Sequence, residues 1–241
     1  APQRLPRLNM QARQRPRFLF IGHSGTFFWA IPETARLLLN QCHPDILMEI
    51  DTWYRGGKDI EFFANAFEVD VLLKENNHEY VVIQDSSRGP ILNPDGFEKF
   101  MPKMIDKVKA SGATPILYAY SGPLEHSPEQ RLEIQERYDR MAKAHGVAVV
   151  PCAAALAHAE QKYPDQNFHN PDQRHVGLRT GTLFAMVWYR TLTGKPAKTI
   201  KNPITLGGYV EPPEDIAKAM AKIADKIIEE RQMPPVLNKA N

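Results

Sequence analysis

Short runs of apolar and β-branched residues recur along the chain, and a helical pattern follows nearly every one of them. Such runs are typical of parallel strands buried on both faces, whereas apolar residues three or four positions apart indicate amphipathic helices. The predicted strands are residues 17–22, 45–53, 79–85, 113–120 and 147–151. The predicted helices are residues 28–40, 96–112, 128–144, an alanine-rich stretch after residue 151, 176–192 and 213–231.

This alternation of strand and helix predicts a fold of the α/β class. We expect three layers, α/β/α, around a flavodoxin-like parallel sheet of about five strands, with right-handed crossovers. The helix at 96–112 has the clearest apolar stripe, and Gly112 is expected to cap its C-terminus. The helix at 213–231 begins at a proline, which suits the first turn of a helix.

The first 16 residues differ in composition from the rest of the chain. They contain four arginines, three prolines and no acidic residue, so residues 1–16 are predicted to be a poorly ordered basic leader. Residues 17–241 are predicted to form one domain, within which 195–212 is a long surface connection. The sequence begins at Ala1 rather than Met. A cleaved secretory signal is one explanation and a shortened chain is another, and export to the periplasm or outside the cell is favoured over the cytoplasm.

Charge and hydropathy narrow the choice of partners. The formal net charge is only +2, which gives no reason to expect nucleic-acid binding. No stretch approaches the roughly 18 to 20 apolar residues that a membrane span needs. The two cysteines, Cys42 and Cys152, fall at opposite ends of the predicted sheet, so two free thiols are expected. Nothing in the sequence predicts the oligomeric state.

Polar and titratable side chains gather after the predicted strands. Parallel sheets place their binding sites at the carboxyl ends of the strands, where these loops meet. His23 and Ser24 follow the first strand, and a long loop with several polar residues follows the fifth. The other polar groups at this edge include residues 54–58 after the second strand and residues 84–87 after the third.

Three of these residues have the chemistry of nucleophilic catalysis. A serine hydroxyl needs a base within hydrogen-bond reach, and that base needs an orienting partner. Ser24 begins a predicted helix, His175 is a candidate base, and Asp172 is close enough in the chain to orient it. The Ser24 amide, an amide of Gly56 or Gly57 and the Gln84 side chain are candidate oxyanion donors, and Gly57 is preferred to Gly56.

The chain resembles the SGNH (GDSL-type) hydrolases over roughly residues 17 to 193. Members of that superfamily carry a nucleophilic serine in a Gly-(Asp/Asn)-Ser turn, a glycine after strand two, an asparagine after strand three and a late Asp-x-x-His. The corresponding residues here are Gly-His-Ser at 22–24, Gly-Gly at 56–57, and Asp-Gln-Arg-His at 172–175. The resemblance implies a serine esterase, in which Ser24, His175 and Asp172 form the triad.

Two positions depart from the superfamily pattern. His23 stands where Asp or Asn is usual, and Gln84 stands where Asn is expected. The segment 83–87 is similar to a Leu-Gln-x-x-Ser motif in a branch of bacterial, often exported members. The resemblance implies carboxylic esters as substrates, and short acyl groups on a carbohydrate, acetyl first, are the expected kind. His23, Ser87 and His169 are further candidates for substrate contact.

The structural alternatives at these positions stay open. Ser24 alone could be a helix cap, Gly57 could serve a positive-φ turn, and His23 is more simply a packed or supporting histidine. His169, Asp172 and His175 are conceivable metal ligands, but no fourth group suggests itself, so no metal is expected. The chain has neither a dinucleotide-binding fingerprint nor a P-loop, so no organic cofactor is expected. Two rival functions remain: a non-catalytic ligand-binding protein on this scaffold, and an acyltransferase with the same triad.

Overall fold

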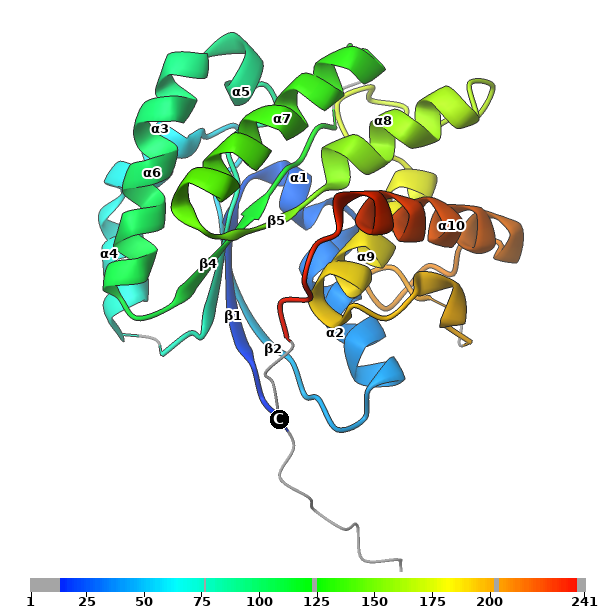
Figure 1. The fold of residues 1–241 in the computed structure, drawn as a ribbon, viewed down its shortest axis with the longest axis horizontal. Helices are drawn as coiled ribbons and strands as arrows, with labels where there is room; N and C mark the ends of the chain where they lie inside the picture. Colours follow the sequence, from blue (N-terminus) through cyan, green and yellow to red (C-terminus); the bar gives the residue numbers. More distant parts are fainter. Residues whose placement is uncertain (1–13, 76, 123–124, 202–203, 238–241) are drawn as a thin grey trace, which may run out of the picture.

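A five-stranded parallel sheet forms the centre of the molecule (Figure 1). The computed structural model describes residues 14–75, 77–122, 125–201 and 204–237. The strands lie in the order β2-β1-β3-β4-β5. Their bounds are β1 (Arg17–Gly22), β2 (Glu49–Tyr54), β3 (Tyr80–Ile83), β4 (Thr114–Tyr118) and β5 (Ala148–Val150). This is the flavodoxin-like order that the sequence predicts.

Helices cover both faces of the sheet, as the alternation of strands and helices predicts (Figure 1). One layer contains α2 (Ile31–Cys42), α8 (Cys152–Lys162), α9 (Leu178–Thr193) and α10 (Glu214–Arg231). The other contains α3 (Ile60–Asn65), α4 (Phe67–Glu75), α6 (Pro94–Ala110) and α7 (Pro128–His145). The short elements are α1 (Ser24–Phe27), η1 (Phe28–Ala30), α5 (Gly89–Leu92) and η2 (Ala197–Thr199).

Successive residues of β1 pack into opposite layers. Phe18 and Phe20 join the cluster with α2, α8, α9 and α10, whereas Leu19 and Ile21 join the cluster with α3, α6 and α7. All four side chains are at most 1% exposed. Burying each of these side chains stabilises the fold by about 1.5–3 kcal/mol relative to leaving it exposed. Because both faces of the strand are buried, its sequence is a continuous run of apolar residues.

Several predicted elements are confirmed closely. The strand at 17–22 has the predicted limits, and the helix predicted at 96–112 is observed at 94–110 with Gly112 at φ +86° beyond its end. The predicted strand at 45–53 begins later, at Glu49. Before Glu49 the pairing is reduced to an isolated parallel bridge between Ile46 and Gln14, and the Met48 amide donates to the Asn40 side chain of α2 (3.0 Å).

The helix predicted over 28–40 is interrupted, which corrects the sequence interpretation. Trp29 and Ala30 adopt positive φ angles of 58° and 43°, and the regular helix starts only at Ile31. Pro32 lies in the first turn of α2, where the missing N–H does no harm. The sequence pattern also did not predict α3 and α4, because their apolar residues do not form one continuous stripe: Phe67 is 74% exposed.

Residues just before β1 and residues in the segment after α9 both contact the rest of the domain. Of the predicted leader, residues 1–13 lie outside the described residues, and Gln14 exchanges backbone hydrogen bonds with Asp45 and Leu47. Within 195–212, Ile204 and Leu206 are buried against the core, so this connection is not wholly at the surface. Both cysteines are free thiols, as predicted. None of the helices among the described residues is both long and apolar enough to cross a bilayer.

The topology fixes where a site is expected. The connection from β1 runs to β2 on one side, and the next strand, β3, pairs with β1 on its other side. The carboxyl ends of β1 and β3 therefore flank the switch point of the sheet, where open α/β folds bind ligands. The residues that follow these two strands are 23–28 and 84–88.

Candidate active site

The turn after β1 is built around His23, which caps α1. Its Nδ1 accepts a hydrogen bond from the Gly25 amide (3.1 Å), and its Nε2 donates to the backbone carbonyl of Asp85 (3.0 Å). These two bonds fix the tautomer, because an amide is a donor and a carbonyl an acceptor. Burial of the ring, which is 3% exposed, lowers the pKa of His23 to about 4. His23 is therefore neutral at neutral pH and performs the capping role usual for Asp or Asn.

Ser24 is the first residue of α1 and is half-buried. Its amide is one of the N–H groups that a helix leaves without an internal partner at its first turn. Its Oγ makes no hydrogen bond to the described part of the chain, so the bond between Ser24 and His175 expected for a triad is not formed here. The hydroxyl is thus free to take a partner.

Asp172 and His175 form a close pair, as their spacing suggests. His175 Nδ1 donates to Asp172 Oδ2 (2.6 Å), and the other carboxylate oxygen accepts from the backbone amides of Arg174 and His175 (both 3.0 Å). The hydrogen bond from His175 is the main reason why the pKa of Asp172 falls to about 2. The ionised carboxylate holds the imidazole with its proton on Nδ1, which leaves the Nε2 lone pair available.

Aromatic residues after Ser24 bring the His175 loop to this turn. The Phe28 ring stacks on the His175 imidazole, with the centroids 3.6 Å apart and the planes 6° from parallel. The Trp29 Nε1–H donates to the Val176 carbonyl (2.7 Å), directly after the histidine. Gly181 of α9 makes room for the indole, since a Cβ there would lie 2.8 Å from the Trp29 Cγ. The loops after β1 and α8 are therefore joined by direct contacts.

Sequence reasoning missed Phe28 and Trp29 as site residues. They were assigned to the start of a regular helix, which would not explain three consecutive large aromatic residues, Phe27 to Trp29, directly after a glycine-rich turn. Pro32 was the usable signal, because it places the true start of the helix after them. The contact between Trp29 and Val176 joins residues 147 positions apart, and no local pattern predicts it.

Gln84 lies beneath the Ser24 turn and is completely buried. Its Oε1 accepts a hydrogen bond from the Thr26 hydroxyl of α1, while its Nε2 has no partner among the described residues. Gly22 allows this approach, since a Cβ at that position would be 2.6 Å from the Gln84 Oε1. A buried amide donor without a partner costs about 1–3 kcal/mol, so it is a candidate to bind a ligand.

The loop after β2 approaches the same turn. The Arg55 amide donates to the Gly22 carbonyl (3.0 Å), and Gly57 follows in an exposed turn at φ +70°. A positive φ favours glycine, so this conformation alone accounts for the residue type. Ser87 lies half-buried in the turn after β3.

The side chain of His169 belongs to a second polar cluster, although its backbone pairs with Val176, directly after His175. Its Nε2 accepts from the fully buried Arg131 (3.1 Å), which also forms a bidentate pair with Glu160 (2.7 and 3.0 Å). Burial first, and then the charge of Arg131, lower the pKa of His169 to about 4. Like that of His23, its ring is almost completely buried, at 6% exposure. Within the described ranges no three His, Cys, Asp or Glu side chains are arranged to hold a metal ion.

Comparisons with known proteins find likeness in structure only. No family model matches the sequence, and no curated protein matches it. A candidate SGNH hydrolase from Slackia heliotrinireducens superposes with a TM-score of 0.62 at 20% identity, covering 74% of this chain and 99% of its own. A DUF4886 family protein from Bacteroides uniformis superposes with a TM-score of 0.73 at 14% identity, covering 92% and 98%.

An enzyme with a named substrate shows the same likeness. An acetyl xylan esterase from Geobacillus stearothermophilus, in a variant form, superposes with a TM-score of 0.60 at 18% identity, covering 74% of this chain and 94% of its own. The chain therefore has the three-layer fold of the SGNH hydrolases.

Proposed function

We propose that the protein is a serine esterase in which Ser24 is the nucleophile, His175 the general base and Asp172 its orienting partner. The observation that carries the proposal is the 2.6 Å bond from His175 Nδ1 to Asp172, on a loop stacked against the Ser24 segment by Phe28. This pairing directs the free Nε2 lone pair of His175 outward from Asp172. The same fold in a named acetyl xylan esterase adds support for ester substrates.

The chemistry follows the usual sequence of acyl transfer. Ser24 Oγ attacks the ester carbonyl carbon while His175 Nε2 takes its proton. The tetrahedral intermediate collapses to an acyl-enzyme, and His175 returns the proton to the leaving alkoxide. Water, activated by His175, then hydrolyses the acyl-enzyme. A hydrogen bond between Ser24 Oγ and His175 Nε2 must form for the first step, and catalytic hydrogen bonds of this kind often form only when substrate is bound.

The oxyanion of the intermediate is bound by the Ser24 amide, the Gly57 amide and the Gln84 side chain. The unpartnered, buried Nε2 of Gln84 supports this assignment, because an oxyanion would supply the acceptor that it lacks. The longer side chain of Gln compared with Asn is accommodated by Gly22, which lies against Gln84. A preorganised donor of this type typically contributes about 10²–10³ in kcat.

The substrate class is a carboxylic ester with a short acyl group, acetyl first, on a small or carbohydrate alcohol. Of the three residues suggested for substrate contact, Ser87 is half-buried at the mouth of the β3 loop and is the most accessible. His23 and His169 are nearly buried, with their ring nitrogens engaged by Gly25 and Asp85 or by Arg131. They contribute to substrate binding only through the loops that they hold.

The experiment is hydrolysis of a short-chain nitrophenyl ester by the wild type and by Ser24→Ala. Loss of the nucleophile should lower kcat by at least about a thousandfold. Ser111→Ala, at the exposed far end of α6, is the matched control and should leave kcat unchanged. Retention of turnover within about tenfold of wild type by Ser24→Ala would refute the mechanism.

One observation favours a second candidate function, a non-catalytic ligand-binding protein on the same scaffold. The Ser24 hydroxyl has no hydrogen bond to the described residues, as a serine that is not activated would also show. A fluorophosphonate probe separates the two functions, because an activated Ser24 is covalently labelled and a passive one is not. Labelling that Ser24→Ala abolishes supports the esterase, and absence of labelling supports the binding protein.

A further inference from the structure

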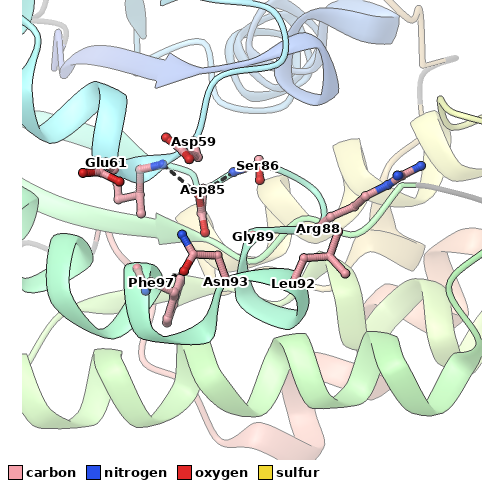
Figure 2. Close-up of a pocket in the computed structure, with 11 residues that line it drawn as sticks. Asp59, Glu61, Asp85, Ser86, Arg88, Gly89, Leu92, Asn93 and Phe97 are labelled. Carbon is pink, nitrogen blue, oxygen red and sulfur yellow. Dashed lines mark hydrogen bonds between the residues drawn. The ribbon is translucent and has the colours of Figure 1, made fainter.

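A separate cavity of about 200 Å³ opens beside the carboxyl end of β3 (Figure 2). It lies between the N-terminal ends of α3 and α6 and the short helix α5. Its polar lining is formed by Asp59, Glu61, Asp85, Ser86, Arg88 and Asn93. Leu92 and Phe97 give it one apolar wall. None of these residues has a role in the proposed esterase mechanism.

Only one of the two carboxylate oxygens of Asp85 accepts hydrogen bonds from the described residues. Its Oδ1 accepts hydrogen bonds from the Ile60 and Ser86 amides, both at 2.7 Å, whereas its Oδ2 has no hydrogen bond to any described residue. The side chain is 2% exposed, and this burial raises the pKa of Asp85 to about 6. An asparagine oxygen would accept the same two amide bonds, so these contacts do not explain why a charged group is buried here.

The free oxygen faces the cavity because the opposite wall is a glycine. A Cβ on Gly89 would overlap Asp85 Oδ2, so any other residue at this position would fill the space in front of that oxygen. Figure 2 shows the second oxygen of Asp85 directed away from its two amide partners, toward Gly89 and Asn93. The unpartnered acceptor thus lies on the side of the carboxylate that borders the cavity.

The charge around this oxygen indicates the kind of ligand. Asp59 and Glu61 add two further carboxylates to the lining. Asp59 lies close enough to raise the pKa of Asp85 by its charge, in addition to burial. The one lining cation, Arg88, is paired with Glu125 outside the cavity. A ligand that brings hydrogen-bond donors and a positive charge would offset both the missing bond and the excess negative charge.

We propose that this cavity binds a small protonated primary amine, whose ammonium donates to Asp85 Oδ2 and whose alkyl part packs against Leu92 and Phe97. Asp59 and Glu61 attract the cation from the rim. A neutral alcohol of the same shape can donate to Asp85 but gains nothing from the surrounding carboxylates. The assignment does not depend on the esterase proposal, since no residue is shared between the two.

The test measures binding of n-butylammonium and of n-butanol to the full chain near neutral pH by amide NMR. The amides of Ile60 and Ser86 report directly, because both donate to Asp85. We expect n-butylammonium to shift these signals saturably, with at least tenfold higher affinity than n-butanol. Asp85→Asn should weaken amine binding at least tenfold, whereas Asp95→Asn, an exposed acid on the first turn of α6, should leave it unchanged.

Each contrary outcome overturns the proposal. The absence of a saturable shift would show that the cavity takes no amine, and equal affinity for n-butanol would show a polar pocket without preference for a cation. Should Asp85→Asn fail to fold, as judged by circular dichroism, Glu61→Gln takes its place because Glu61 is exposed. Amine affinity should then fall severalfold, and an unchanged affinity in Glu61→Gln would refute the site.

Discussion

Replacing His23 by asparagine should make the protein less sensitive to acid. The pKa of His23 is lowered from 6.5 to about 4 by burial, so the unfolded chain binds a proton at this position more readily than the folded protein does. The stability that the neutral His23 contributes is therefore fully present above the unfolded pKa, and it is lost as the pH falls from about 6.5 toward 4. Between about pH 7 and pH 5, a shift of this size costs about 2 kcal/mol of unfolding free energy. Asparagine does not titrate and retains a side-chain oxygen for the cap on Gly25.

The comparison with wild type isolates this contribution from other groups that titrate over the same range. Burial also lowers the pKa values of His126 and His169 to about 4, which adds to the acid sensitivity of both proteins. Asp85 acts in the opposite sense, because its raised folded pKa of about 6 makes the folded state bind a proton first. The contributions of these three groups are the same in both proteins, so they cancel when the variant is compared with wild type.

Urea unfolding near pH 7 and near pH 5 measures the effect. We expect His23→Asn to be less stable near pH 7 by roughly 1 kcal/mol, because the hydrogen bond to the Asp85 carbonyl is lost. Between pH 7 and pH 5, the variant should lose about 2 kcal/mol less unfolding free energy than the wild type does. Equal losses in the two proteins would refute the conclusion that His23 is buried in its neutral form.

Two predictions concern the proposed reaction. Trp29→Phe removes the donor to the Val176 carbonyl, so we expect kcat on a nitrophenyl ester to fall about tenfold with little change in KM, because the His175 loop is less well held. An unchanged kcat would show that the indole does not position His175. Gln84→Met keeps the shape of the side chain but removes the proposed oxyanion donor, and kcat should fall about 10²-fold. A normal kcat in this variant would exclude Gln84 from the oxyanion hole.

The framework of the fold could be predicted because its signals are local. Strands buried on both faces need apolar residues at successive positions, and residues 18–21 and 80–83 satisfy this requirement. The apolar stripes of α6 and α10 likewise repeat every three or four residues, so each step of the pattern is local. The pairing of Asp172 with His175 spans only three residues, so spacing alone suggested it.

The details of the site could not be predicted because they depend on contacts between distant segments. His23 bonds to a carbonyl 62 residues away, and without that partner its sequence position gave no reason to prefer histidine over Asp or Asn. Trp29 has a positive φ, its indole donates to the Val176 carbonyl, and the ring occupies the space that the missing side chain of Gly181 leaves. The sequence interpretation placed Gln84 in the oxyanion hole but did not single out Asp85, whose unusual environment comes from α3 and α5.

Gln84 and Asp85 are adjacent in the sequence, yet their side chains lie on opposite faces of the sheet. Side chains alternate along a strand, and in β3 Tyr80 and Val82 face one helix layer while Val81 and Ile83 face the other. The alternation continues past the strand end: Gln84 contacts Thr26 of α1, and Asp85 contacts the start of α3.

The two proposed sites should therefore respond separately to substitution. Gln84→Met should reduce ester hydrolysis without changing amine affinity, and Asp85→Asn should do the reverse. The backbone offers one route between them, since His23 bonds to the Asp85 carbonyl and caps the helix that begins at Ser24. A change in kcat on adding n-butylammonium, lost in Asp85→Asn, would show that amine binding at Asp85 is coupled to the esterase site.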